Sequence, residues 1–273
     1  MNCNFARLFF LVCLACVLAA CASSPVPPPY PAYIAVGELP DAFVAGLPGV
    51  RAKHLSGDPR TQRASYRIQI PSDWSFTTGA SPGQSVEIYV LAGAIQLGEF
   101  DLTKGGYAYL PPGLSGLSMK SVNGALILYF LDEANDASVI QTPLITNSDL
   151  LTWEPQDIGV STKDLRSDPG SGARTWLLNI SADAILPWQR SSQMVEGYLI
   201  AGSIAYSECS GEKFGTETYA TGGYFHRPPG AVHAGPETQT AAGATWLLRV
   251  LGPEKIEVVD GCASAIAGEP PIS

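Results

Sequence analysis

Residues 222–235, with the sequence GGYFHRPPGAVHAG, hold two of the chain's three histidines, His226 and His233, on either side of a Pro-Pro-Gly turn. The stretch MVEGYLIAGSIA, which carries Glu196, precedes them in the chain. Clusters of glycine and proline between apolar runs mark tight turns between strands. The sequence therefore predicts that imidazole groups gather beside a turn in a β-structure.

The chain contains an internal repeat, which GGYAYLPPG from Gly105 and GGYFHRPPG from Gly222 illustrate. GVRAKHLSGDP from Gly49 likewise aligns with GVSTKDLRSDP from Gly159, and VEIYVLAGAI with VEGYLIAGSI. Self-similarity on this scale indicates two copies of one domain, and 273 residues are enough for each copy to bury its own core. We place the domains at residues 41–148 and 149–255, with a tail at 256–273.

The composition favours an all-β chain, because hydrophobic residues make up 46% and charged residues only 15%, with 28 glycines and 22 prolines. We expect strands at residues 66–70, 87–91 and 126–130, and at 175–180, 196–200 and 245–250. The similar segments WLLNI and WLLRV are expected to pair in one wall. Both faces of the strand that contains Glu196 are largely apolar, so one can pack on another sheet while the other lines a small barrel.

The glycine, proline and histidine spacing resembles the cupin family of double-stranded β-helix, jelly-roll-like barrels, whose motifs are GxxxxxHxHxxxxE and GxxxxxPxGxxH. Pro228, Gly230 and His233 match the second motif, and Glu196 takes the glutamate position of the first. The expected histidines of the first motif fall on Arg190 and Ser192. The resemblance implies two tandem barrels, a bicupin, similar to ChrR-like (anti-sigma-factor type) cupins and two-cupin proteins of unknown function.

Cupins hold one divalent metal with a glutamate and three histidines, so the resemblance implies that each repeat could have a metal site if it keeps these residues. In the first repeat the corresponding positions are Ser81, Gly83, Glu87 and Gly116, so we expect no metal there. In the second, Glu196, His226 and His233 could form a two-histidine, one-carboxylate set for Fe, Mn, Zn or Ni. The alternative is that Glu196 and His233 share a hydrogen bond in a polar pocket.

Arg190 argues against a metal site in the second barrel, because a guanidinium repels metal ions. The same group binds carboxylates in a bidentate manner. It indicates a pocket for a small polar or acidic ligand, unless Arg190 lies in a solvent-exposed loop. Tyr224 would line that pocket together with the predicted ligand-binding residues, which are Glu196, His233, Arg190, Tyr198 and Trp188.

The N-terminus is typical of an export signal, with Arg7 before an apolar run at residues 8–20, and the last three residues of the run with Cys21 read Leu-Ala-Ala-Cys. This ending resembles the lipobox of bacterial lipoproteins, so we expect removal of residues 1–20 and lipid attachment at Cys21. A proline-rich tether at residues 21–40 would follow. We therefore expect a lipid-anchored protein of the cell envelope, which in a Gram-negative cell would be in the outer membrane or face the periplasm. Cys209 and Cys262 could then pair in an oxidising compartment.

Three functions stay open at this stage: a module that binds a small molecule in the second barrel, a metal-dependent dioxygenase or isomerase, and a structural envelope protein. The net charge of −9 opposes binding to nucleic acid. We expect no nucleic-acid partner, a membrane contact through the lipid, and association through cupin sheets in a homodimer as a further option.

Overall fold

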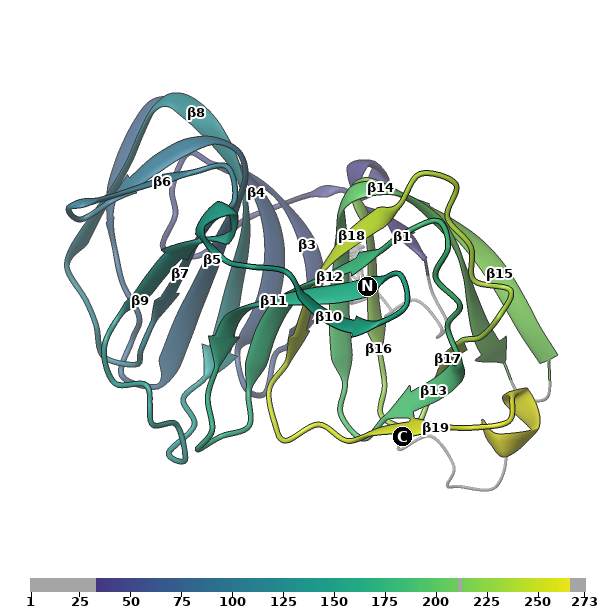
Figure 1. Ribbon diagram of the computed structural model, residues 1–273. Helices are drawn as coiled ribbons and strands as arrows, with labels where there is room; N and C mark the ends of the chain where they lie inside the picture. Colours follow the sequence, from purple (N-terminus) through teal and green to yellow (C-terminus); the bar gives the residue numbers. More distant parts are fainter. Residues whose placement is uncertain (1–32, 211–212, 266–273) are drawn as a thin grey trace, which may run out of the picture.

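The computed structural model describes residues 33–210 and 213–265, and the predicted signal peptide and Cys21 lie outside these ranges. The described chain is all-β and folds into two barrels that lie side by side (Figure 1). Three short 3-10 helices, η1 (Val36–Glu38), η2 (Ser148–Leu150) and η3 (Cys262–Ala265), complete it. None of the helices in the described part is long and apolar enough to cross a membrane.

The first barrel is an eight-stranded sheet whose order is β2-β3-β4-β8-β5-β7-β9, with β6 paired to β5. Its core is packed with aliphatic side chains such as Ile68, Ile88 and Ile127, which are fully buried. The strands are β2 (Asp41–Ala42), β3 (Arg51–Asp58), β4 (Arg63–Thr78), β5 (Gln84–Leu97), β6 (Phe100–Thr103), β7 (Gly106–Leu110), β8 (Leu117–Glu133) and β9 (Leu144–Asn147).

The second barrel repeats this plan, because β14 pairs with β16 and β18 as β5 pairs with β7 and β8. The expected pairing of WLLNI with WLLRV is confirmed, since Trp176 lies opposite Leu248 and Leu178 opposite Trp246. The strands are β10 (Glu154–Asp157), β11 (Val160–Ser167), β12 (Arg174–Ile180), β13 (Trp188–Ser191), β14 (Val195–Ser210), β15 (Lys213–Ala220), β16 (Gly223–Arg227), β17 (Val232–Ala234), β18 (Ala244–Val250) and β19 (Ile256–Val258).

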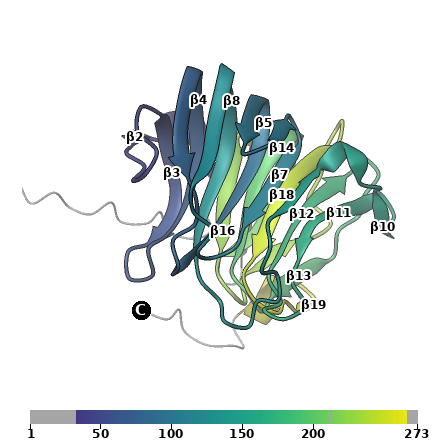
Figure 2. The same cartoon turned by 90° about the vertical axis from the view of Figure 1, so that its left-hand side faces the viewer.

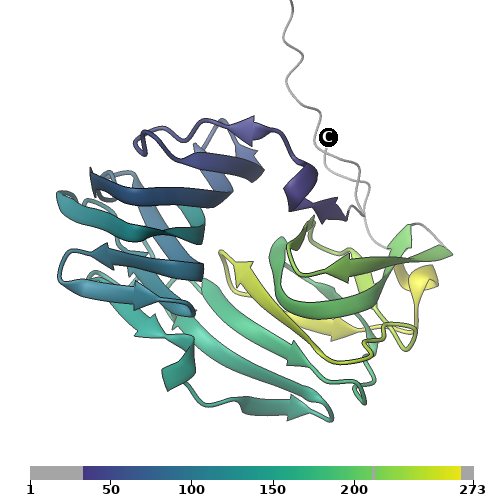
Figure 3. The same cartoon turned by 90° about the horizontal axis from the view of Figure 1, so that it is seen from above.

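The segment before the first barrel belongs to the fold, which corrects the predicted extent of the tether. Strand β1 (Ile34–Ala35) pairs with β16 of the second barrel, with Ile34 opposite Tyr224. The chain then passes to β2 in the first barrel, a path that the purple N-terminal segment follows in Figure 3. Residues 33–40 therefore join the two barrels instead of forming a free spacer.

The two barrels pack against each other through equivalent faces of their sheets, whose strands lie in succession in Figure 2. Leu55, Tyr89 and Tyr107 of the first barrel meet the repeat-related Leu165, Tyr198 and Tyr224 of the second in one buried cluster. Side chains alternate between the faces of a strand, so every second residue faces the other barrel and the remainder face the barrel interior. This alternation determines where each candidate site residue lies.

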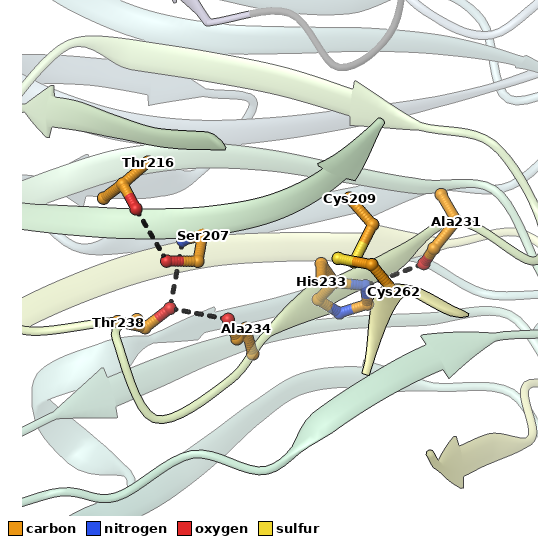
Figure 4. The surroundings of a disulfide bond; sticks show 8 residues. All are labelled: Ser207, Cys209, Thr216, Ala231, His233, Ala234, Thr238 and Cys262. Carbon is orange, nitrogen blue, oxygen red and sulfur yellow. Dashed lines mark hydrogen bonds between the residues drawn. A yellow bond between two sulfur atoms is a disulfide. The ribbon is translucent and has the colours of Figure 1, made fainter. Parts of the chain in front are cut away.

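A disulfide joins Cys209 at the end of β14 to Cys262 in η3, with their Cα atoms 5.3 Å apart. The structure thus forms the pairing that the sequence left open. Both cysteines are buried with Val232, and Trp188 packs against them. The bond fastens the C-terminal segment to β14, which pairs with β17, the strand that carries His233. Figure 4 shows the imidazole of His233 beside the disulfide.

Candidate functional site

The second barrel encloses a cavity of about 280 Å³. Its walls come from alternate residues of β12, β16 and β18, namely Trp176 and Leu178, Phe225 and Arg227, and Trp246 and Leu248. Gly197 on β14 leaves room for Phe225, because a Cβ atom at Gly197 would lie 2.3 Å from that ring. Ile185 and Ile256 line the same cavity and are 76% and 58% exposed, so apolar side chains extend from the interior to the surface.

His233 on β17 supplies a neutral imidazole to this cavity. Its Nδ1 atom lies 3.0 Å from the carbonyl oxygen of Ala231, a contact drawn in Figure 4. Burial lowers the pKa of His233 well below its usual 6.5, and the positive charge of Arg227 lowers it further. The ring therefore stays unprotonated at neutral pH and packs nearly parallel to Tyr206, with centroids 6.2 Å apart.

Arg227 and Glu208 form a buried ion pair at the same end of the cavity. Nη2 of Arg227 donates to Oε1 of Glu208 at 2.5 Å, and both side chains are 3% exposed. The guanidinium also lies 4.0 Å from the ring centroid of Phe225. The negative charge of Glu208 balances the positive charge of the buried Arg227, so this end of the cavity is polar without a net charge from the pair.

Glu196 does not share a pocket with His233, which corrects the predicted central pair. It projects from the opposite face of β14 into the inter-barrel contact, where Ser65 donates to Oε1 at 2.8 Å and Tyr224 at 2.9 Å. Ser56 donates to the same oxygen, and Arg249 Nη1 donates to Oε2 at 2.9 Å. The reason is the alternation along β14: Val195 lines the cavity, so the next residue, Glu196, faces the first barrel.

The predicted metal set of Glu196, His226 and His233 does not form. His226 lies opposite Glu196 in the β14–β16 ladder, on the face away from the cavity that His233 lines. The first-motif alignment is also one residue out of register. Gln189 and Ser191 line the cavity, instead of Arg190 and Ser192, and Val195 takes the inward position expected for Glu196.

The other predicted ligand-binding residues also lie outside the cavity. Arg190 pairs with Glu257 at 2.9 Å, with side-chain exposures of 29% and 61%, so it is a surface arginine. Tyr198 and Tyr224 belong to the inter-barrel cluster. Trp188 packs beside the disulfide and against Phe214. Of the predicted set, only His233 lines the cavity.

The inter-barrel face carries a buried charge network with a pseudo-two-fold organisation. Glu87, the repeat partner of Glu196, accepts from Tyr107 at 2.6 Å and from Thr175 at 2.6 Å. Tyr107 and Thr175 mirror Tyr224 and Ser65 around Glu196. Glu87 therefore has a hydrogen-bonding role at the contact between the barrels.

Arg249 is the centre of this network and connects both repeats. Its Nη2 donates to Glu87 at 3.0 Å and to Asp132, while its Nη1 donates to Glu196. Arg166 adds a second cation, 2.8 Å from Glu87. The carboxylates of both barrels therefore share one buried guanidinium, and the network spans the contact between the barrels.

The comparison with known protein families agrees with this architecture. Residues 44–256 match the model of DUF4437, a domain of unknown function. The chain belongs to the DUF4437 family. No curated protein matches it.

Solved structures show that this DUF4437 chain has the cupin fold. A proposed dioxygenase from Nostoc punctiforme is 22% identical with a TM-score of 0.66, and the match covers 86% of this chain and 84% of the other. Ylba from E. coli, of family DUF861, is 17% identical with a TM-score of 0.67 and coverages of 83% and 92%. A mutant oxalate decarboxylase from Bacillus subtilis is 11% identical, with a TM-score of 0.60 and coverages of 83% and 79%.

The oxalate decarboxylase has Mn(II) centres, so the cupin fold implies a metal that must be tested against the residues present here. The inward positions on β13 and at the start of β14 hold Gln189, Ser191 and Val195, which leave His233 as the one imidazole in the lining of the cavity. Across residues 33–210 and 213–265, no three His, Cys, Asp or Glu side chains are grouped so that they could hold a metal ion. This donor set does not fit a cupin metal.

Sequence analysis missed Arg227, Glu208 and Gln189. Arg227 was visible inside the RPPG turn, and its two-residue spacing from Phe225 was the available signal. Glu208 lies two residues after Tyr206 on the same strand, so it has the same inward direction. Such spacing identifies a shared face but does not say whether that face is the interior of the barrel.

Proposed function

We propose that this DUF4437 chain is an exported binding protein that holds a small, largely apolar molecule in its second barrel, while the first barrel has a structural role. The observation that carries the proposal is the cavity of about 280 Å³ with aromatic walls and a few buried polar groups. Ligand sites are typically concave, mostly apolar and equipped with a small number of convergent polar groups.

The difference between the barrels supports the division of roles. Val195 lies opposite Arg227 in the second barrel, and the equivalent pair in the first is Val86 and Leu110. His233 likewise corresponds to Gly116 in the aligned repeats. The first barrel therefore has a leucine and a glycine where the second has an arginine and a histidine.

Export to the cell envelope with a lipid on Cys21 is part of the same proposal. The apolar run at residues 8–20 and the Leu-Ala-Ala-Cys ending support it, although they lie outside the described residues. The disulfide between Cys209 and Cys262 supports an oxidising compartment, where such bonds persist.

The proposed binding is tested by calorimetric titration of the purified protein with toluene and phenol as probes. We expect millimolar or tighter affinity in the wild type and at least a tenfold loss in Leu178→Trp, which fills the cavity. The matched control is Ile158→Trp, which adds the same side chain at a position that is 75% exposed. Failure of both probes to bind the wild type, or equal binding by the two variants, would contradict the proposed function.

A further inference from the structure

We infer that the second-barrel cavity selects a phenol, a small aromatic molecule whose hydroxyl group is recognised by His233 and Gln189. The inference deepens the proposed function and rests on it. Three features support it: the hydrogen-bonding groups of the two side chains, the aromatic residues in the walls, and the pairing of the nearby Arg227 with Glu208.

The bond to Ala231 fixes which nitrogen of His233 is an acceptor. A carbonyl oxygen can only accept, so the proton of the neutral ring must be on Nδ1, which lies 3.0 Å from that oxygen. The Nε2 atom consequently carries a lone pair and no proton. His233 thus offers the cavity a hydrogen-bond acceptor, and a ligand must supply an O–H or N–H group to use it.

Gln189 lies beside this acceptor and offers a donor. Its amide Nε2 donates to Nε2 of His233 across 3.4 Å, a long hydrogen bond that an inserted ligand oxygen can replace with two shorter ones. An oxygen placed about 2.9 Å from each nitrogen completes a triangle with that edge. A hydroxyl group at this point can donate to His233 and accept from Gln189 at the same time, so one hydroxyl satisfies both side chains.

The remainder of the lining favours an aromatic ring. Trp176, Tyr206, Phe225 and Trp246 all face the cavity, and aromatic side chains pack well against further rings in stacked or edge-to-face arrangements. Trp246 is 1% exposed, and its indole N–H has no hydrogen-bond acceptor among the residues that the structure describes. A polar ligand atom or the face of a ligand ring would give this group a partner.

The charges beside the cavity disfavour an anionic ligand. Arg227 is paired with Glu208, so a ligand carboxylate would have to compete with a buried carboxylate that is already in place. Arg174, which also lines the cavity, is likewise paired, with Asp164, so an entering carboxylate would lose its hydration without gaining a cation of its own. Arg190, which suggested an acidic ligand in the sequence, pairs with Glu257 on the surface.

The test is a calorimetric comparison of phenol, toluene and benzoate, with His233→Leu and Gln189→Leu as variants and His226→Leu as the control on the opposite strand face. We expect the wild type to bind phenol about tenfold more tightly than toluene. The reason is that the phenol hydroxyl can form hydrogen bonds with His233 and Gln189, and toluene cannot. Each cavity variant should lose this preference and still bind toluene. The control should keep the preference.

The outcomes separate this inference from the proposed function. If toluene and phenol bind the wild type equally, or if benzoate binds best, hydroxyl recognition is wrong while the cavity remains a binding site. If no probe binds the wild type, the proposed function itself fails. The wild-type comparison needs no variant, so a substitution that prevents folding leaves the test intact.

Discussion

Arg249→Met is expected to lower the free energy of unfolding at pH 7 by about 3–5 kcal/mol, the cost typical of removing one partner from a buried ion pair. Arg249 is 1% exposed and donates to Glu87, Glu196 and Asp132, which belong to both barrels. The three carboxylates would then be buried with too little positive charge. Urea unfolding monitored by circular dichroism measures the loss.

The control for this prediction is Arg190→Met, which removes an ion pair at the surface. We expect it to cost about 0.5 kcal/mol or less, because exposed pairs contribute little. Adding Asp132→Asn to Arg249→Met should recover part of the loss, since the two side chains are direct partners. Equal losses from Arg249→Met and Arg190→Met would show that the network does not hold the barrels together.

The acid sensitivity of the protein is expected to depend on Glu87. Burial raises the pKa of this carboxyl, but attraction by Arg249 and Arg166 and hydrogen bonds from Thr175 and Tyr107 outweigh it, so the pKa falls from 4.5 to about 2. A lowered folded-state pKa stabilises the protein above pH 4.5, and that stability is lost as the pH falls from 4.5 to about 2. The shift corresponds to about 3 kcal/mol.

Glu87→Gln should therefore be less stable than the wild type at pH 7, and the difference should shrink by pH 3. Asp132 acts in the opposite sense, because burial raises its pKa and its contribution is lost as the pH rises. The effect of Asp132 partly offsets the fall in the free energy of unfolding with decreasing pH, and it does so in both the wild type and Glu87→Gln. Chemical unfolding at pH 7 and pH 3 gives the comparison, with the exposed Glu99→Gln as a control. A difference that stays constant with pH would exclude this role for Glu87.

The fold could be predicted from the sequence because it depends on features that are local or repeated. The Pro-Pro-Gly turns and the apolar strands predict all-β structure, the internal repeat predicts two similar domains, and the resemblance to cupins implies that each is a barrel. The WLLNI–WLLRV pairing followed from the similarity of the two segments. These signals do not depend on which face of a strand is inside.

The site could not be predicted with the same success, because a shift of one residue exchanges the two faces of a strand. Both faces of β14 are apolar, since one lines the cavity and the other packs on the first barrel, so polarity did not reveal the direction. Aligning the motif on Glu196 placed Arg190 and Ser192 inward, whereas Gln189 and Ser191 line the cavity.

The charge network was also outside the reach of sequence analysis. Arg249 and Glu87 are 162 residues apart in the chain and meet only when the barrels pack. The internal repeat gave no signal for it either, because Arg249 takes the place of Phe130: Glu196 lies opposite Arg249, and the equivalent Glu87 lies opposite Phe130.

The most direct test of the binding account is a crystal structure of the protein equilibrated with 4-bromophenol, whose bromine is located by anomalous scattering. We expect a bromine peak inside the second barrel among Trp176, Phe225 and Trp246, with the phenol oxygen within hydrogen-bonding distance of His233 and Gln189. A peak found only between the barrels beside Glu196, or only on the outer surface, would contradict it.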